Sequence, residues 1–185
     1  MKPSMLLERA KAGKISSTEI DTVAKKLKSD ESTEDSYTLL HILGVANATK
    51  YETEVVRYLH CSTDPMLARI ALQVLSNHWD KASRYRVEIE AFVRGVAWDE
   101  EEDVRLAAIS IAGELSRTSD KKLVSLLASI FSDMQQRQIV RQAAYFALAR
   151  ALGLNWDELP PASRILDLES ATDPRVSDWI SNQEN

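Results

Sequence analysis

The segment Glu101–Gly113 reads EEDVRLAAISIAG, and two other segments of the chain share its pattern. Residues 64–76 read DPMLARIALQVLS, and residues 137–149 read RQIVRQAAYFALA. In each segment an aliphatic or small residue precedes an arginine, and an alanine stands two places after it. A fixed period of this length is typical of stacked repeat proteins, so these segments decide the fold. The three arginines stand 36 residues apart, at Arg69, Arg105 and Arg141.

Apolar residues surround each arginine with the spacing of a helix, and another amphipathic segment precedes each of these helices. Asp64 can cap the first arginine helix, and Pro65 suits its first turn, where no backbone donor is needed. Gly153 is a natural stop for the third. No strand pattern competes with this reading. We therefore predict an all-α fold, a right-handed α-α superhelix of about four to five antiparallel helix pairs with divergent ends.

The length of 185 residues suits a single domain, 1–185, which we divide into three parts. Residues 1–48 contain two amphipathic runs that lack the arginine pattern of the three segments, and they are expected to cap the open end of the stack. Residues 49–153 hold three repeats of period 36. Residues 154–185 form a capping tail, in which two prolines break the helical pattern before a short closing helix.

The residues of the three repeats resemble a known family. The Asp-Pro turn at 64–65 and the small-Arg-x-Ala pattern at Arg69 are similar to the second helix of a HEAT repeat. The sequences VRLAA at 104–108 and VRQAA at 140–144 match that pattern more closely, although Glu102-Asp103 replaces the Asp-Pro turn. The resemblance implies a HEAT-like α-solenoid. It says little about function, because such solenoids serve as scaffolds, inhibitors and, in some cases, enzymes.

Charge and composition exclude several classes of function. The formal net charge is −5; residues 1–92 carry 13 basic and 13 acidic side chains, and residues 93–185 carry 10 and 15. A chain without a basic excess is not expected to bind nucleic acid. No uncharged run approaches the length of a membrane span, and no secretory signal is recognisable. The single cysteine excludes an intrachain disulfide. We therefore expect a soluble, cytoplasmic protein.

The arginines and the acidic run each have two interpretations. Arg69, Arg105 and Arg141 could form an anion-binding row, but we favour a structural ladder in which each bonds an acid or carbonyl of a neighbouring turn. The acidic run spans Asp99–Asp103 and stands directly before a helix. Negative charge there complements the helix dipole, which is the reading we favour, although the run could also receive a basic partner.

The sequence contains no recognisable catalytic or metal-binding pattern. His41, His60 and His78 belong to three different predicted helices, and none has a cysteine or histidine at ligand spacing. Cys61 lies beside His60, and the two point about a hundred degrees apart on a helix. No glycine-rich phosphate loop is present. We therefore predict no enzyme activity, no catalytic residue, no metal and no cofactor.

The residues one, four and five places after each arginine should face the inner, concave side of the stack. Six of these nine residues are apolar or aromatic, where a solvated face would be polar. Either this face is an open contact surface, or the tail or a tight curl of the superhelix covers it. We favour the open surface, with an acidic rim beside it. The predicted partner-binding residues are Ile70, Leu106, Ile109, Tyr145 and Phe146, with Asp99, Glu100 and Glu101 in the rim.

These observations predict a non-catalytic module that binds another protein. Small, mildly acidic HEAT-like solenoids resemble regulators and inhibitors, including the immunity proteins with which bacteria neutralise their own toxins. The resemblance therefore implies a partner that is a toxin or another basic effector. A ligand-binding or lyase-type enzyme, a DNA-base glycosylase, and a structural adaptor of a larger complex are the alternatives. The charge balance speaks against the glycosylase.

Overall fold

The computed structural model describes residues 2–29, 35–117, 120–161, 167–168 and 170–183. Every regular element in these ranges is helical, which confirms the all-α class. The chain divides into two compact units, which are described separately. Unit 1 comprises Met1–Arg86 and Val96–Ala107, and unit 2 comprises Val87–Gly95 and Ala108–Asn185. Two helices, α6 (Arg86–Arg94) and α7 (Asp103–Ser116), contribute residues to both units.

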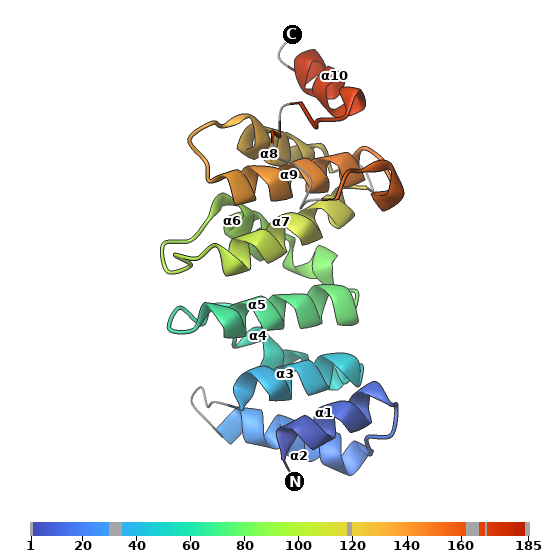
Figure 1. Ribbon diagram of the computed structural model, residues 1–185. Helices are drawn as coiled ribbons and strands as arrows, with labels where there is room; N and C mark the ends of the chain where they lie inside the picture. Colours follow the sequence, from blue (N-terminus) through green and yellow to red (C-terminus); the bar gives the residue numbers. More distant parts are fainter. Residues whose placement is uncertain (1, 30–34, 118–119, 162–166, 169, 184–185) are drawn as a thin grey trace. The chain divides into compact units, whose positions relative to one another are not determined.

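Unit 1 begins with three helices, α1 (Pro3–Lys11), α2 (Ser17–Ser29) and α3 (Ser36–Val45), which Figure 1 shows in blue. It continues through η1 (Thr49–Tyr51), α4 (Glu52–Val56), α5 (Pro65–Gln73), η2 (Val74–His78) and η3 (Ala82–Tyr85). The segments η1 and η3 are 3₁₀ turns, and η2 is a π-helical turn. Helix α3 packs against α1, α2, α5 and η2, so it forms the centre of this unit.

Local sequence signals explain where the helices of unit 1 begin. Before α2, the Ser16 hydroxyl accepts from the Glu19 N–H at 3.3 Å, and the Glu19 carboxylate accepts from the Ser16 N–H at 2.8 Å. This reciprocal pair is a capping box. At the start of α5, Asp64 Oδ1 accepts from the Met66 N–H at 3.0 Å, and Pro65 occupies the first turn. The predicted Asp-Pro cap is therefore confirmed.

Three details of unit 1 differ from the sequence-based expectation. Residues 1–48 contain a third helix, α1, which packs on α3 and which the pattern analysis did not predict. Helix α4 ends at Val56, after which the chain continues in turns. The helix expected over residues 64–79 is α-helical only to Gln73 and then widens into η2, where the Trp79 N–H donates to the Val74 carbonyl at 3.0 Å.

Unit 2 contains α8 (Lys121–Ser132), α9 (Gln138–Ala151), η4 (Trp156–Glu158) and α10 (Pro174–Gln183), besides its parts of α6 and α7. Helices α8 and α9 pack against each other as a pair. Beyond α9 the Leu154 N–H donates to the Ala149 carbonyl at 3.0 Å while Gly153 takes a φ of 90°, a conformation that glycine adopts without strain. The predicted glycine stop is confirmed, and so is the short closing helix after the prolines, as α10.

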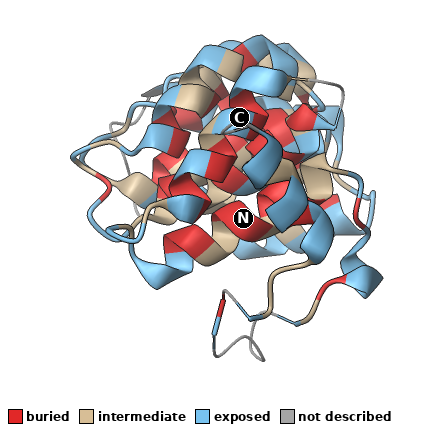
Figure 2. Cartoon of the chain, turned by 90° about the horizontal axis from the view of Figure 1, so that it is seen from above, coloured by how far each residue is buried: buried red, intermediate tan, exposed pale blue. Residues whose placement is uncertain are grey.

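Many helices carry buried residues on one side and exposed residues on the other, as Figure 2 shows. In unit 1 the fully buried side chains come mainly from α3 and α5, including Leu40, Leu43 and Leu72. In unit 2 they include Leu127 of α8 and Leu148 of α9. Each unit therefore has an apolar interior of its own, built from the helical apolar spacing that the sequence displays.

Candidate protein-binding surface

The structure places most of the predicted inner-face anchors in the interior. Ile70 is 3% exposed, and Ile109 and Tyr145 are 0% exposed. The expectation that these three side chains form an open surface is therefore wrong, because side chains without exposed area complete the packing of their own helices. Leu106 and Phe146 are half-buried and keep some accessible surface.

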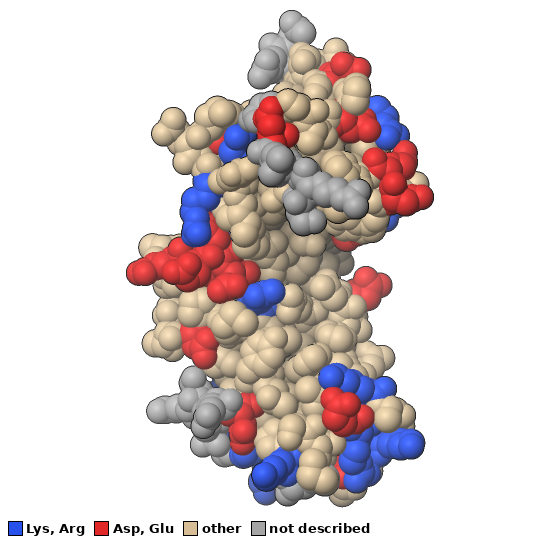
Figure 3. Space-filling view, viewed as in Figure 1, with Lys and Arg blue, Asp and Glu red and all other residues tan. Residues whose placement is uncertain are grey.

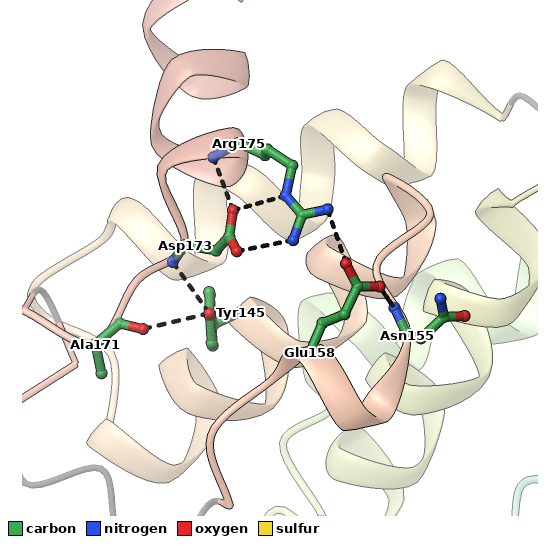
Figure 4. Close-up of polar contacts among 6 residues, drawn as sticks. All are labelled: Tyr145, Asn155, Glu158, Ala171, Asp173 and Arg175. Atoms are coloured by element: carbon green, nitrogen blue, oxygen red, sulfur yellow. Dashed lines mark hydrogen bonds and ion pairs between the residues drawn. The ribbon is translucent and has the colours of Figure 1, made fainter.

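Tyr145 is covered by the tail of the chain, the second of the two alternatives that the sequence left open. Its hydroxyl donates to the Ala171 carbonyl at 3.4 Å and accepts from the Asp173 N–H at 3.2 Å (Figure 4). Burial raises the pKa of the Tyr145 phenol. Tyr145 therefore supports the segment before α10 through these two hydrogen bonds, and its side chain is not open to a partner.

A second set of contacts ties α10 to η4. Arg175 donates to Asp173 through Nε at 3.0 Å and to Glu158 through Nη1 at 3.0 Å, as Figure 4 shows. The Asp173 carboxylate also accepts from the Arg175 N–H at 2.9 Å. Asp173 and Glu158 together raise the pKa of the Arg175 guanidinium. The pKa of Glu158 is lowered, mainly by the hydrogen bond from the Asn155 N–H and to a smaller extent by the bond from Arg175.

Four aromatic rings form a row in unit 2 that runs from the interior to the surface. The centroid distances are 5.8 Å for Phe131–Tyr145, 5.3 Å for Tyr145–Phe146 and 6.0 Å for Phe146–Trp156. These separations and their tilted planes are those of favourable aromatic pairs. The inner end of the row is buried, whereas Trp156 at the outer end is 59% exposed.

Arg150 of α9 holds the exposed end of this row in place. Its guanidinium carbon lies 5.1 Å from the centroid of the Trp156 ring. The same group donates to Glu114 Oε1 from Nε and Nη2, both at 3.1 Å, and to the Leu154 carbonyl from Nη1 at 3.2 Å. Only 11% of the Arg150 side chain is exposed, so its position is set by these bonds. We call Phe146, Arg150 and Trp156 the Trp156 surface.

The Trp156 surface has an acidic border. Asp157 and Glu158 follow the tryptophan directly in η4, and both are exposed. Glu114 contributes a side chain that is 51% exposed and already pairs with Arg150. Sequence analysis missed Trp156 and Arg150 because they lie outside the three arginine segments. A signal was present, however: Glu114 and Arg150 are oppositely charged and stand 36 residues apart, which is the repeat period.

The arginine column has the structural role that the sequence favoured. Arg69 donates to Asp103 Oδ1 at 3.0 Å. Arg105 pairs with Glu102 at 3.2 Å, and Arg141 donates from Nε to the Phe131 carbonyl at 2.9 Å. Arg105 and Arg141 are each only 8% exposed. Each arginine bonds an acid or a carbonyl of a neighbouring turn, which confirms the ladder interpretation.

The residues of the acidic run before α7 have two different environments: one caps the helix, and others are exposed. Asp99 is 5% exposed, and its Oδ2 accepts from the Val104 N–H at 3.0 Å and the Arg105 N–H at 2.9 Å. The capping role is thus confirmed, and Asp99 belongs to the interior and not to a rim. Glu100 and Glu101 are exposed, and acidic side chains gather where this loop lies (Figure 3). Their contact with a partner stays a prediction.

Three further features of the described residues concern metal binding, the cysteine and membrane insertion. Among them, no group of three or more His, Cys, Asp or Glu side chains could hold a metal ion. Cys61 is half-buried, and its Sγ lies 3.6 Å from the Thr63 hydroxyl. None of the helices in the described ranges is long and apolar enough to cross a membrane.

Comparison with known proteins gives no relative of this chain. No family model matches the sequence, no curated protein matches it, and no solved structure matches the fold. The relation to HEAT repeats therefore rests on the residues of the three arginine segments and remains a resemblance.

Proposed function

We propose that this chain is a non-catalytic protein-binding module, built as a HEAT-like solenoid, that binds its partner through the Trp156 surface. The single observation that carries the proposal is Trp156 itself, a large apolar side chain that is 59% exposed and yet in contact with two neighbouring side chains. Phe146 packs against it and Arg150 stacks on it. A side chain that is already ordered loses little conformational freedom when a partner covers it.

The composition of the Trp156 surface is that of an interface hot spot. Tryptophan and arginine are enriched among the few residues that dominate binding energies, and truncating such an anchor typically costs about 2 kcal/mol or more. Here both lie together, with an aromatic neighbour that leads into the core. Burying the exposed part of the indole would remove apolar surface from water, which is the main driving force for association.

The acidic border favours a basic partner. Asp157 and Glu158 follow the tryptophan in η4, where Glu158 pairs with Arg175, and Glu114 pairs with Arg150. A lysine or arginine of a partner could stack on the indole and pair with Asp157, the border carboxylate next to it in the chain. A cation over an indole face contributes about 0.5–2 kcal/mol, depending on how far it is desolvated. Rim charges act mainly on the association rate and its salt dependence.

The resemblance to small HEAT-like regulators extends the proposal to an inhibitory role. In that role the chain binds a basic effector, such as a toxin, and blocks its action. This step is supported by the resemblance to HEAT-like regulators and by the acidic border of the Trp156 surface. Co-expression tests it: the chain should relieve the growth defect caused by the captured effector, and Trp156→Ala should not.

The binding proposal is tested by affinity capture from the native source with three forms of the chain. Wild type and Met134→Ala should retain the same partner, because Met134 is another exposed large apolar side chain of unit 2, 66% exposed, outside the Trp156 surface. Trp156→Ala should lose that partner while its circular dichroism matches the wild type. Equal recovery by all three forms would show that the partner binds elsewhere.

The half-buried Leu106 and the exposed Glu100 and Glu101 belong to unit 1 and stay as predicted partner contacts. Replacing both glutamates by lysine tests them separately from the Trp156 surface. If they steer a basic partner, the double variant should slow association and flatten its salt dependence, while the dissociation rate changes little. An unchanged association rate would remove these two residues from the interface.

A further inference from the structure

Two histidines that are far apart in sequence meet in unit 1. His41 lies in α3 and His78 ends η2, and their ring centroids are 5.8 Å apart with an interplanar angle of 50°. Neither imidazole makes a hydrogen bond to another residue in the described part of the chain. His78 is exposed and His41 is half-buried, so the pair opens to solvent on one side. The ring nitrogens are therefore available to a ligand.

The packing of α3 on η2 fixes the distance between the two rings. A Cβ at Gly44 would lie 2.7 Å from Val74 Cγ2 and 3.0 Å from His78 Cδ2, closer than carbon atoms approach without a shift. The missing side chain thus lets the His78 ring lie directly on α3. Gly44 stands three residues after His41, on the same side of the helix. The imidazole of His78 therefore packs against α3 at Gly44, beside that of His41.

His78 is the last residue of a π turn. The turn at η2, closed by the bond from the Trp79 N–H to the Val74 carbonyl, holds one residue more than an α-turn. Single π turns of this kind occur frequently at functional sites.

The distance between the two ring centroids is compatible with one shared ion. Imidazole nitrogen binds Zn²⁺ at about 2.0–2.1 Å, so two rings that share an ion have centroids roughly 5–6 Å apart. The observed 5.8 Å lies in this range. Imidazole is also the side chain that zinc, copper and nickel share as a preferred ligand.

We propose that His41 and His78 together bind one divalent transition-metal ion, with water in its remaining coordination positions. Affinity should follow the general order for such ions, with Cu²⁺ above Ni²⁺ and Zn²⁺. The ion would link α3 to η2 in the centre of unit 1. Lys11 of α1 adds positive charge near His41, which opposes the cation, although Glu8 pairs with that lysine at 3.0 Å. This site is independent of the Trp156 surface, which lies in the other unit.

Isothermal titration of the tag-free full chain with Zn²⁺ and Cu²⁺, after dialysis against a chelator, tests the site. Wild type should bind one ion per chain. His41→Ala and His78→Ala should each weaken binding by about tenfold or more, since each removes half of the protein ligands. His60→Ala is the matched control, because His60 is the remaining histidine of the chain, and it should bind as the wild type does.

A second measurement needs no variant and so does not depend on whether one folds. In nuclear magnetic resonance spectra of the wild-type chain, added Zn²⁺ should shift the imidazole signals of two histidines together and leave the third unchanged. Failure of the wild type to bind one ion would overturn the proposal. So would binding that persists when both His41 and His78 are replaced, or a shift that includes His60.

Discussion

Gly113 offers the sharpest test of how unit 2 is packed. It lies in α7, and a Cβ added there would stand 2.8 Å from both the Cα and the carbonyl oxygen of Ala147 in α9, and 2.9 Å from its Cβ. Carbon atoms in favourable contact are separated by about 3.5–4.0 Å. Two of the three blocking atoms belong to the backbone, so no change of rotamer can relieve the overlap. Gly113→Ala must therefore push the two helices apart.

The net effect of Gly113→Ala is a difference between two opposing contributions. Alanine is favoured over glycine inside a helix by about 1 kcal/mol. Overpacking a close-packed interior costs about 1–3 kcal/mol, and the rigid backbone at Ala147 points to the upper half of that range. The expected result is a net loss of about 1–2 kcal/mol in the free energy of unfolding.

Urea denaturation followed by far-ultraviolet circular dichroism measures this loss for wild type and Gly113→Ala. Gly44→Ala is the comparison, because it has the same gain in helix propensity but meets only side-chain atoms of Val74 and His78. Those side chains can move, so the variant should be destabilised less than Gly113→Ala. A Gly113→Ala chain that equals or exceeds the wild type in stability would refute the close approach of α7 and α9.

Three further outcomes follow from single side chains. Asp99→Ala removes the acceptor for two backbone N–H groups at the start of α7 and should lower the free energy of unfolding by about 1–2 kcal/mol in urea denaturation; no loss would mean that another group caps the helix. Tyr145→Phe removes the hydroxyl bonded to Asp173, so hydrogen exchange should quicken in α10 and not in α8; unchanged exchange would show that other contacts hold the tail. The hydrogen bond from Lys81 is the largest cause that lowers the pKa of Glu52. The contribution of Glu52 to stability is therefore present above the unfolded pKa and is lost as pH falls through the folded pKa. Glu52→Gln should flatten the acid side of the profile of unfolding free energy against pH, and an unchanged profile would contradict this.

The sequence predicted those parts of the fold that depend on local signals. The arginine frame located α5, α7 and α9 because apolar spacing, an Asp-Pro cap and a glycine stop act within a few residues. The same pattern indicated the ladder role of the arginines. Helix α1 was missed although Leu6 and Ala10, both buried, stand one helical turn apart. That signal is present in the chain but too short to be decisive.

The parts that escaped prediction depend on contacts between distant segments. Tyr145 reads as an inner-face anchor, but its exposure is decided by a segment more than twenty residues away that rests on its hydroxyl. The π turn at η2 accompanies the close approach at Gly44, thirty residues earlier. Trp156 gains its fixed position from Arg150, whose own partner is Glu114. Helical periodicity cannot report such pairings, because it describes one helix at a time.

Trp156 is the anchor of the proposed binding surface. The most direct measurement is the dissociation constant of the captured partner for wild type, Trp156→Ala and Met134→Ala, determined by surface plasmon resonance at two salt concentrations. Trp156→Ala should weaken binding by about thirtyfold, the equivalent of a hot-spot loss of about 2 kcal/mol, with Met134→Ala near the wild type. Wild-type affinity in Trp156→Ala would contradict the claim.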